Sequence, residues 1–330
     1  MCFACAVYVS EARNAATVER LEQLARSSEG ACLANLFVDE PYNRTNFTLV
    51  GRSPPQLAAA VVALAQEALQ LLDMRRHTAT HPRLGTVDHI SCHPLTALPA
   101  AAAPGAAAGA EQQQRQARQQ PGEQQACGNS AAVEAAPSAA GAEAATAALA
   151  QSIAVQLGSG PHALPVFTYG WAHPQRQPLD EIRRQLGYFQ GAAASSWQGA
   201  LGTVQLPLAP CYGPASAPPH SGVCCVGAVP WLINYNVLLH TTDLGAARAV
   251  ARAVSERGGG LAGVQAMALR HTDGIEVACN LLDPAASPPE AVLAAVQRLA
   301  AQHGGLVVGP AYRTNKSPEQ LVAAAAAQGV

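Results

Sequence analysis

The sequence predicts an α+β fold made of two β-α-β-β-α-β sandwich lobes with a ligand crevice between them. Two stretches of the chain each contain short apolar runs, typical of strands, and longer runs with helical periodicity. In both stretches these runs follow the order strand, helix, strand, strand, helix, strand. The chain has 330 residues, 49% of them hydrophobic, which is enough for one large core or two modest ones. A crevice between two such lobes is a usual place for a ligand.

The first stretch, residues 1–96, is expected to form one subdomain. Asn14 can cap its first helix, and Gly30 ends that helix because glycine readily adopts the left-handed conformation. The second helix begins after Ser53 with two prolines, which suit a first helical turn. We expect strands at residues 5–9, 31–38, 46–50 and 87–95, and helices at residues 14–27 and 53–72.

The loop between the second helix and the fourth strand holds the densest group of reactive side chains. His81 precedes Pro82, which disfavours helical backbone, so we expect His81 on an extended loop. Its imidazole, with an ordinary pKa of about 6.5, suits proton transfer, although a loop histidine can instead simply bond the backbone. Asp88 begins the next strand and either orients an imidazole or bonds a turn.

The same region offers further polar candidates. Arg44 and Arg83 either bind a carboxylate through the guanidinium fork or lie on the surface. His89 and His93 lie about 13 Å apart along one strand, too far to share a metal ion, so no metal is expected. Because Asp88 alternates with His89, we expect it to point the other way, with Ile90, and both histidines to be solvated.

The segment from Asp73 to Asp88 also carries a resemblance. It reads Asp73-Met74-x-Arg76-His77-x3-His81-Pro82-Arg83-x-Gly85-x2-Asp88 and resembles the active-site segment of the formiminotransferase domain, the folate-dependent half of formiminotransferase-cyclodeaminase. The resemblance implies that His81 is the catalytic proton donor and acceptor. It does not decide whether Asp88 orients an imidazole or hydrogen-bonds a turn.

Residues 97–141 are dominated by alanine, glutamine, glycine and proline. Such a segment cannot bury enough apolar surface to offset its ordering entropy, so we predict a disordered low-complexity insertion. Residues 142–330 are expected to form the second subdomain, with residues 187–231 rich in loops. We expect helices near residues 143–156, 179–186, 244–257 and 288–302, and strands at residues 164–169, 232–240, 261–270, 275–282 and 306–308.

A proline-rich loop within the second subdomain is the other candidate binding element. Its prolines preset the backbone, so a ligand would lose less entropy in ordering it; the alternative is an ordinary connector. In place and length it is similar to the folate-binding loop of the same family. The loop consists of Gly213, Pro214, Ala215, Ser216, Ala217, Pro218, Pro219, His220, Ser221 and Gly222.

The resemblance extends to short segments around Asn43 and Asn236. It implies that Asn43, Arg44, Arg83 and Asn236 bind substrate. Tyr8 stands where the family usually has asparagine, and Val229 where it usually has arginine. The segment at residues 10–14 looks like a divergent branch found in plants and algae. No cyclodeaminase domain follows in this sequence.

The resemblance implies a folate-dependent transferase. It would move a formimino group from N-formimino-L-glutamate, or a related donor, to N5 of tetrahydrofolate, a one-carbon step of histidine catabolism. Tetrahydrofolate is the expected co-substrate. The alternative is a catalytically altered protein that binds folate or acts as a scaffold.

The amino-acid composition limits the binding partners and the cell compartment that we expect. The formal net charge of −2 argues against nucleic-acid binding, and no apolar run is long enough to span a membrane. Nine cysteines at irregular spacing indicate a reducing compartment rather than a disulfide scaffold. We therefore expect a cytoplasmic protein, with an organelle left open. We expect small molecules as its ligands and leave a homodimer open.

Overall fold

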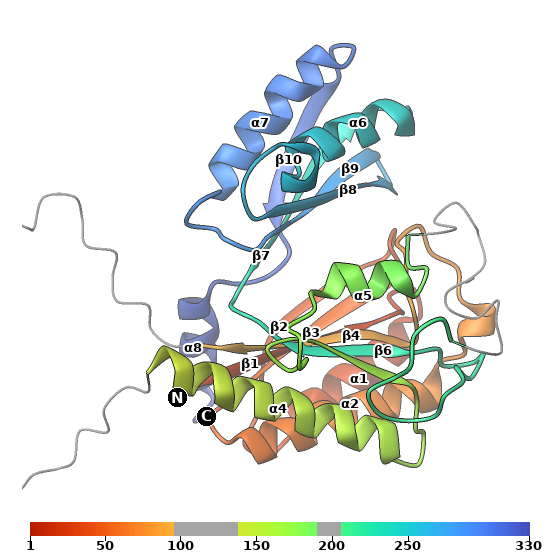
Figure 1. Cartoon of the computed structure of the whole chain (residues 1–330), viewed down its shortest axis with the longest axis vertical. Helices are drawn as coiled ribbons and strands as arrows, with labels where there is room; N and C mark the ends of the chain where they lie inside the picture. The colour runs from red at the N-terminus through yellow and green to blue at the C-terminus, as the bar shows by residue number, and fades with distance from the viewer. Residues whose placement is uncertain (96–137, 190–205) are drawn as a thin grey trace, which may run out of the picture.

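The computed structural model describes residues 1–95, 138–189 and 206–330. It contains two sheets, each with helices on its outer face, and confirms the predicted α+β class (Figure 1). The order β-α-β-β-α-β occurs between Phe3 and Pro94 and again between Ile233 and Arg313. Across the described ranges, no helix is both long and apolar enough to cross a membrane.

The first sheet has six strands in the order β2-β3-β1-β4-β6-β5. The first four pair antiparallel, whereas β6 lies parallel to both β4 and β5. Its strands are β1 (Phe3–Val9), β2 (Cys32–Asp39), β3 (Arg44–Gly51), β4 (Val87–Pro94), β5 (Val166–Gly170) and β6 (Cys224–Ala228).

The two sheets divide between β6 and β7, which lies beyond the insertion predicted at residues 97–141 to separate the subdomains. Strand β6 is missed there because it is short and buried on both faces, so it has no alternating pattern to distinguish it from an apolar loop. Helix α4 (Ala139–Ser159) packs on the core of the first sheet and begins inside the predicted insertion. Residues 97–137 of that insertion lie outside the described residues.

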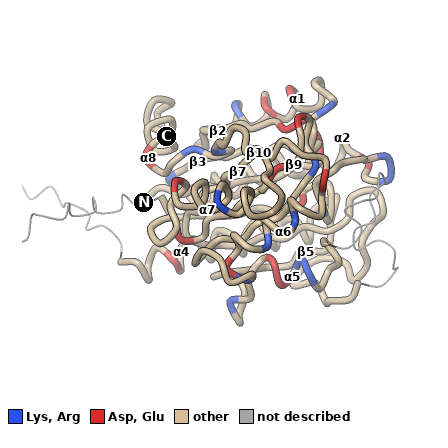
Figure 2. The backbone as a smooth tube through the Cα atoms, turned by 90° about the horizontal axis from the view of Figure 1, so that it is seen from above, with Lys and Arg blue, Asp and Glu red and all other residues tan. Residues whose placement is uncertain are grey.

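Three helices cover the outer face of the first sheet: α4, α1 (Ala15–Arg26) and α2 (Pro54–Leu71). The predicted cap is present, since the Asn14 side chain accepts the Thr17 amide hydrogen at 3.2 Å. Helix α5 (Leu179–Gln185) lies on the opposite, inner face (Figure 1). Its acidic first turn and basic last turn, visible in Figure 2, both complement the helix dipole.

The second sheet is antiparallel, in the order β10-β7-β9-β8. Its outer face packs on α6 and α7, and its inner face turns towards the first sheet (Figure 1). The last helix, α8, returns to the first lobe and packs against β2. These elements are β7 (Ile233–His240), α6 (Leu244–Val254), β8 (Val264–His271), β9 (Gly274–Leu281), α7 (Pro289–Gln302), β10 (Val307–Arg313) and α8 (Pro318–Ala327), with short 3-10 helices at Met74–Arg76 and Glu256–Gly258.

A β-bulge at the start of β4 changes the predicted orientation of its side chains. Tyr8 pairs with His89 and Val9 with Val87, so Asp88 has no partner on β1. An extra residue of this kind rotates the strand locally, and Asp88 therefore reaches the same partners as His89. The expectation that His89 and His93 are solvated is wrong, because they are only 9% and 2% exposed beneath the second lobe.

We expect Gly85→Ala to destabilise the fold, because Gly85 bridges to Gly222 where the histidine loop meets the segment before β6. An added Cβ would lie 2.4 Å from the Val223 carbonyl oxygen, and backbone cannot move aside cheaply. Overpacking of this kind typically costs about 1–3 kcal/mol. Urea unfolding would measure this loss.

Gly245→Ala is the matched control. Its Cβ would meet only the Asp243 side chain, at 3.1 Å, in the first turn of α6. Its free energy of unfolding should stay within about 1 kcal/mol of the unmodified protein's, since alanine favours helix. Equal stability of the two variants would contradict the proposed role of Gly85.

Candidate functional site

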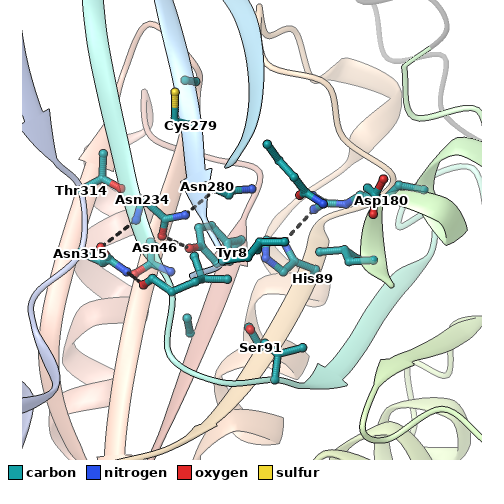
Figure 3. A pocket seen from close by; sticks show the side chains of 18 of the residues that line it. Tyr8, Asn46, His89, Ser91, Asp180, Asn234, Cys279, Asn280, Thr314 and Asn315 are labelled. Atoms are coloured by element: carbon teal, nitrogen blue, oxygen red, sulfur yellow. Dashed lines mark hydrogen bonds between the residues drawn. The ribbon is translucent and has the colours of Figure 1, made fainter. Parts of the chain in front are cut away.

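A cavity of about 510 Å³ lies between the inner faces of the two sheets. That volume is typical of small-molecule sites. Side chains of β1, β3 and β4 line one wall, and those of β7, β8 and β9 line the other. A hydrogen bond joins the two walls, since Tyr8 Oη donates to Asn234 Oδ1 at 3.0 Å (Figure 3). Within the second wall, Asn234 Nδ2 donates to Asn280 Oδ1 at 2.7 Å.

Asp88 is a buried charge behind the cavity wall, where it contacts the lining residues Arg44 and Arg183. Its Oδ2 accepts hydrogen bonds from Arg44 at 2.8 Å and Arg183 at 2.6 Å, and its Oδ1 accepts one from the Leu84 amide at 2.6 Å. Burial by itself would raise the pKa of Asp88, but Arg183 and Arg44 hold that pKa well below its usual range. Asp88 thus anchors the histidine loop and two arginines rather than hydrogen-bonding His81.

His81 lies in the cavity wall, as the sequence predicts for a reactive residue. Its Nδ1 is 2.7 Å from the Pro82 carbonyl oxygen, which can only accept, so Nδ1 carries the proton and Nε2 has the lone pair. Tyr42 and Tyr188 contact the ring edge-on. Burial, and then the charge of Arg44, lower the pKa of His81 to about 3, which keeps the imidazole neutral at pH 7.

A second buried carboxylate, Glu276, joins the two lobes. It is 1% exposed and accepts hydrogen bonds from Tyr42 Oη at 2.7 Å, Asn236 Nδ2 at 2.8 Å and Tyr312 Oη at 2.7 Å. Tyr42 comes from the first lobe and the other two donors from the second. Asn236 lines the cavity, and its hydrogen bond to Glu276 fixes the direction of its amide. Its predicted contact with substrate stays a prediction.

Two of the predicted substrate residues lie outside the cavity. Asn43, at a φ of 49°, accepts the Ala12 amide hydrogen at 2.8 Å and donates to the Thr78 carbonyl at 3.0 Å. Arg83 donates to the His77 carbonyl at 2.9 Å. Both side chains therefore hold neighbouring loops together. Neither lines this cavity, so their predicted binding of substrate stays a prediction.

The predicted folate-binding loop also lies outside the cavity lining. It runs beside the histidine loop, where the Met74 amide donates to the His220 carbonyl and the Thr86 amide to the Ser221 carbonyl, each at 2.8 Å. Gly213, at a φ of 89°, approaches the Leu164 carbonyl too closely for a Cβ. The loop is thus tied to the segment that carries His81, and its ligand contacts stay a prediction.

Several cavity residues were not singled out from the sequence. Arg183 sits on a predicted helix next to Arg184, and nothing local distinguishes which of the two points inward. His89 was considered as a metal ligand and expected to be solvated, although it shares a strand face with Ser91 and His93, which also line the cavity. Among the described residues, no group of three or more histidine, cysteine or acidic side chains could hold a metal ion.

Comparison with known proteins gives one family and several relatives. A family model described as the formiminotransferase domain, N-terminal subdomain, matches residues 2–229. A formiminotransferase cyclodeaminase-like protein of Arabidopsis thaliana is 36% identical over 324 residues, which cover 96% of this chain and 94% of that protein.

Two further relatives are more distant. A glutamate formimidoyltransferase of Streptococcus pyogenes serotype M1 is 26% identical over 258 residues, covering 78% of this chain and 68% of that enzyme. A formimidoyltransferase-cyclodeaminase of Rattus norvegicus is 26% identical over 289 residues, covering 84% of this chain. The match spans only 43% of the rat protein.

Asp88→Asn should lower the free energy of unfolding at pH 7 by about 3–5 kcal/mol, because it leaves two buried guanidinium groups without their carboxylate. Asp180→Asn is the control, since Asp180 pairs with Arg184, whose side chain is 39% exposed. An i,i+4 pair of that kind contributes only about 0.3–0.5 kcal/mol. Denaturant unfolding of the two variants measures both losses.

The contribution of Asp88 should also depend on pH. Its pKa is depressed in the folded state, so the stabilisation is present above the unfolded pKa of about 3.9 and is lost as pH falls below it. The stability difference from Asp88→Asn should stay constant between about pH 7 and pH 5 and shrink below about pH 4. A difference that shrinks between pH 7 and pH 5 would contradict this assignment.

Proposed function

The chain belongs to the formiminotransferase-domain family, and we propose that it transfers a formimino group from N-formimino-L-glutamate, or a related donor, to N5 of tetrahydrofolate. Several relatives are named as glutamate formimidoyltransferases or formimidoyltransferase-cyclodeaminases, which supports formimino transfer at the level of the family. The observation that carries the proposal is His81, a neutral imidazole in the wall of a cavity between two lobes.

The proposed reaction needs one group that accepts a proton and returns it. N5 of tetrahydrofolate attacks the formimino carbon, and the resulting tetrahedral adduct expels glutamate as its amine. A bond from carbon to N5 forms, and the bond from carbon to the glutamate nitrogen breaks. His81 Nε2 takes the proton that N5 loses and delivers it to the departing nitrogen, so the imidazole ends the cycle neutral.

The surroundings of His81 suit that role. Its Nδ1–H bond to the Pro82 carbonyl fixes the tautomer, so Nε2 starts in the form that accepts a proton. A pKa of about 3 in the ligand-free site makes the neutral imidazole a weak base, and it makes the imidazolium a strong acid that returns its proton readily once formed. Tyr42 and Tyr188 hold the ring from two sides.

The cavity also offers surfaces for both substrates. Trp171, Trp231 and Tyr169 line it, and aromatic faces of this kind stack on flat rings such as a pterin. Arg44 and Arg183 provide positive charge for carboxylates. We retain the role of residues 213–222 in folate binding as part of the proposal, since that loop is hydrogen-bonded to the histidine loop.

Two observations favour a second candidate, a folate-binding protein without transfer activity. Tyr8 replaces the asparagine usual in the family, and its ring stacks on His89 inside the cavity. Val229 replaces a usual arginine at the cavity wall. Both changes alter the surface that would hold the donor and leave His81 in place.

A binding and transfer assay separates the two candidates. Calorimetry with tetrahydrofolate measures binding, and turnover with N-formimino-L-glutamate and a panel of related formimino and formyl donors measures transfer. Binding with transfer supports the enzyme. Binding without transfer from any donor supports the second candidate, and a failure to bind tetrahydrofolate overturns both.

His81→Ala should lower kcat by about 100- to 10,000-fold, the usual cost of losing a general acid–base group. Tetrahydrofolate affinity should change far less, because His81 is assigned to proton transfer. His77→Ala is the control: His77 belongs to the same loop but lines a separate pocket on the other side of it. Melting temperatures of both variants check the fold. Equal losses of kcat in the two variants would contradict the assignment of proton transfer to His81.

The activity should also report the protonation of His81. Because the neutral imidazole is the active form and its pKa in the ligand-free site is about 3, kcat/KM should not fall through protonation of His81 between pH 7 and pH 5. A steady-state pH profile, with stability checked at each pH, measures this. An acid limb centred near pH 6.5 that disappears in His81→Ala would contradict the buried, neutral imidazole.

A further inference from the structure

His89 is a second cavity histidine that the proposed reaction does not use. It lies outside the Asp73–Asp88 segment that carries the family resemblance. Its ring stacks on Tyr8, with ring centroids 4.1 Å apart and planes 11° from parallel. The two residues pair directly across β1 and β4, and Figure 3 shows them together in the cavity. This stacking fixes the plane of the imidazole.

The contacts of His89 also fix the position of its proton. Nδ1 lies 3.2 Å from Arg44 Nη2 and 2.8 Å from Arg183 Nη2. The Asp88 carboxylate oxygen Oδ2 lies farther from Nδ1, at 3.6 Å, which is beyond hydrogen-bond distance. A guanidinium group can only donate and stays charged, so Nδ1 accepts from the two nearer arginines and the ring proton is on Nε2. Burial, and then Arg183, hold the pKa of His89 well below its usual range. His89 is therefore a permanent N–H donor through Nε2.

That donor has no partner in the rest of the described protein. No hydrogen bond joins His89 Nε2 to another of the described residues, whereas Nδ1 has two. The side chain is 11% exposed and lines the cavity. A polar N–H group in such a place is expected to meet water or a ligand.

The charges behind His89 favour an anion there. Arg44 and Arg183 share the single carboxylate of Asp88, so this buried cluster carries one more positive than negative charge. Buried charges are normally balanced. Among the other charged side chains that line the cavity, Asp180 pairs with Arg184 and Arg176 with Glu143. Asp39 accepts the Tyr42 amide hydrogen and lies 3.6 Å from His271.

We propose that His89 Nε2–H, backed by Arg44 and Arg183, binds a carboxylate of a substrate and so helps to determine which substrates this chain accepts. The proposal rests on the proposed function for the identity of the ligands. The carboxylate belongs either to the glutamyl donor or to the glutamate of tetrahydrofolate, since both carry the same group. A neutral group in the same place would bind more weakly, because it is not attracted by the net positive charge of Arg44, Arg183 and Asp88.

Two substitutions separate the N–H donor from the rest of the cluster. His89→Asn keeps an acceptor oxygen near the position of Nδ1, for the arginines, and removes the donor at Nε2. His89→Gln keeps an N–H group at the longer reach. We expect His89→Asn to weaken carboxylate binding by about 10- to 100-fold, as for one hydrogen bond to a charged group, and His89→Gln to recover most of it.

Calorimetry with matched probes identifies the carboxylate. If it is the donor's, His89→Asn weakens N-formyl-L-glutamate but not its neutral diamide. If it is that of folate, His89→Asn weakens tetrahydrofolate but not its neutral derivative in which both glutamate carboxylates are converted to amides. Either result supports the proposal. Equal losses for charged and neutral probes, or no loss for any of them, overturn it.

Two controls keep this test independent of the transfer reaction. Glutarate carries the carboxylates and no transferable group, so His89-dependent glutarate binding without any transfer would overturn the proposed function and leave this site standing. Failure of the unmodified protein to bind any of the carboxylate probes overturns the site. Nitrogen-15 NMR should find the His89 proton on Nε2, and a protonated Nδ1 would overturn the assigned tautomer.

Discussion

The burial of the Asp88 carboxylate is the constraint on which the rest of the site depends. A buried charge is costly unless it is paired and hydrogen-bonded, and the bulge in β4 leaves Asp88 fully buried. Arg44 must therefore come from β3, Arg183 from α5, and the Leu84 amide from the histidine loop. One carboxylate thus fixes a strand, a helix and the loop that carries His81.

The two lobes are held around the cavity by polar contacts of the same kind. Glu276 collects donors from both lobes, and the Tyr8–Asn234 bond joins the two sheets directly. Because Glu276 is buried and the Tyr8–Asn234 bond is half-buried, the ligand-free protein already shapes the cavity, which lowers the ordering cost of binding. The two histidines then differ in chemistry: the backbone leaves His81 an acceptor nitrogen, and the arginines leave His89 a donor.

Local sequence was sufficient for the repeated element order and for the position of His81 on the loop before β4. Strands with one buried face, helix caps and the turn before Pro82 are all decided by neighbours in the chain. Asp88 was found, but its partners were not, because the bulge that turns it inward depends on pairing with β1. Strand β6 and the inward direction of Arg183 depend likewise on contacts between segments far apart in the sequence. The hydrophobic periodicity of a single segment carries no information about such contacts.

The central claim is that one-carbon transfer takes place in the cavity between the lobes, at His81 Nε2. A crystal structure of the protein with 5-formyltetrahydrofolate bound tests it most directly. The account predicts that the ligand lies in this cavity, with N5 or its formyl group within about 3 Å of His81 Nε2, directly or through one water. A ligand that binds elsewhere, or that faces a different side chain at N5, would contradict it.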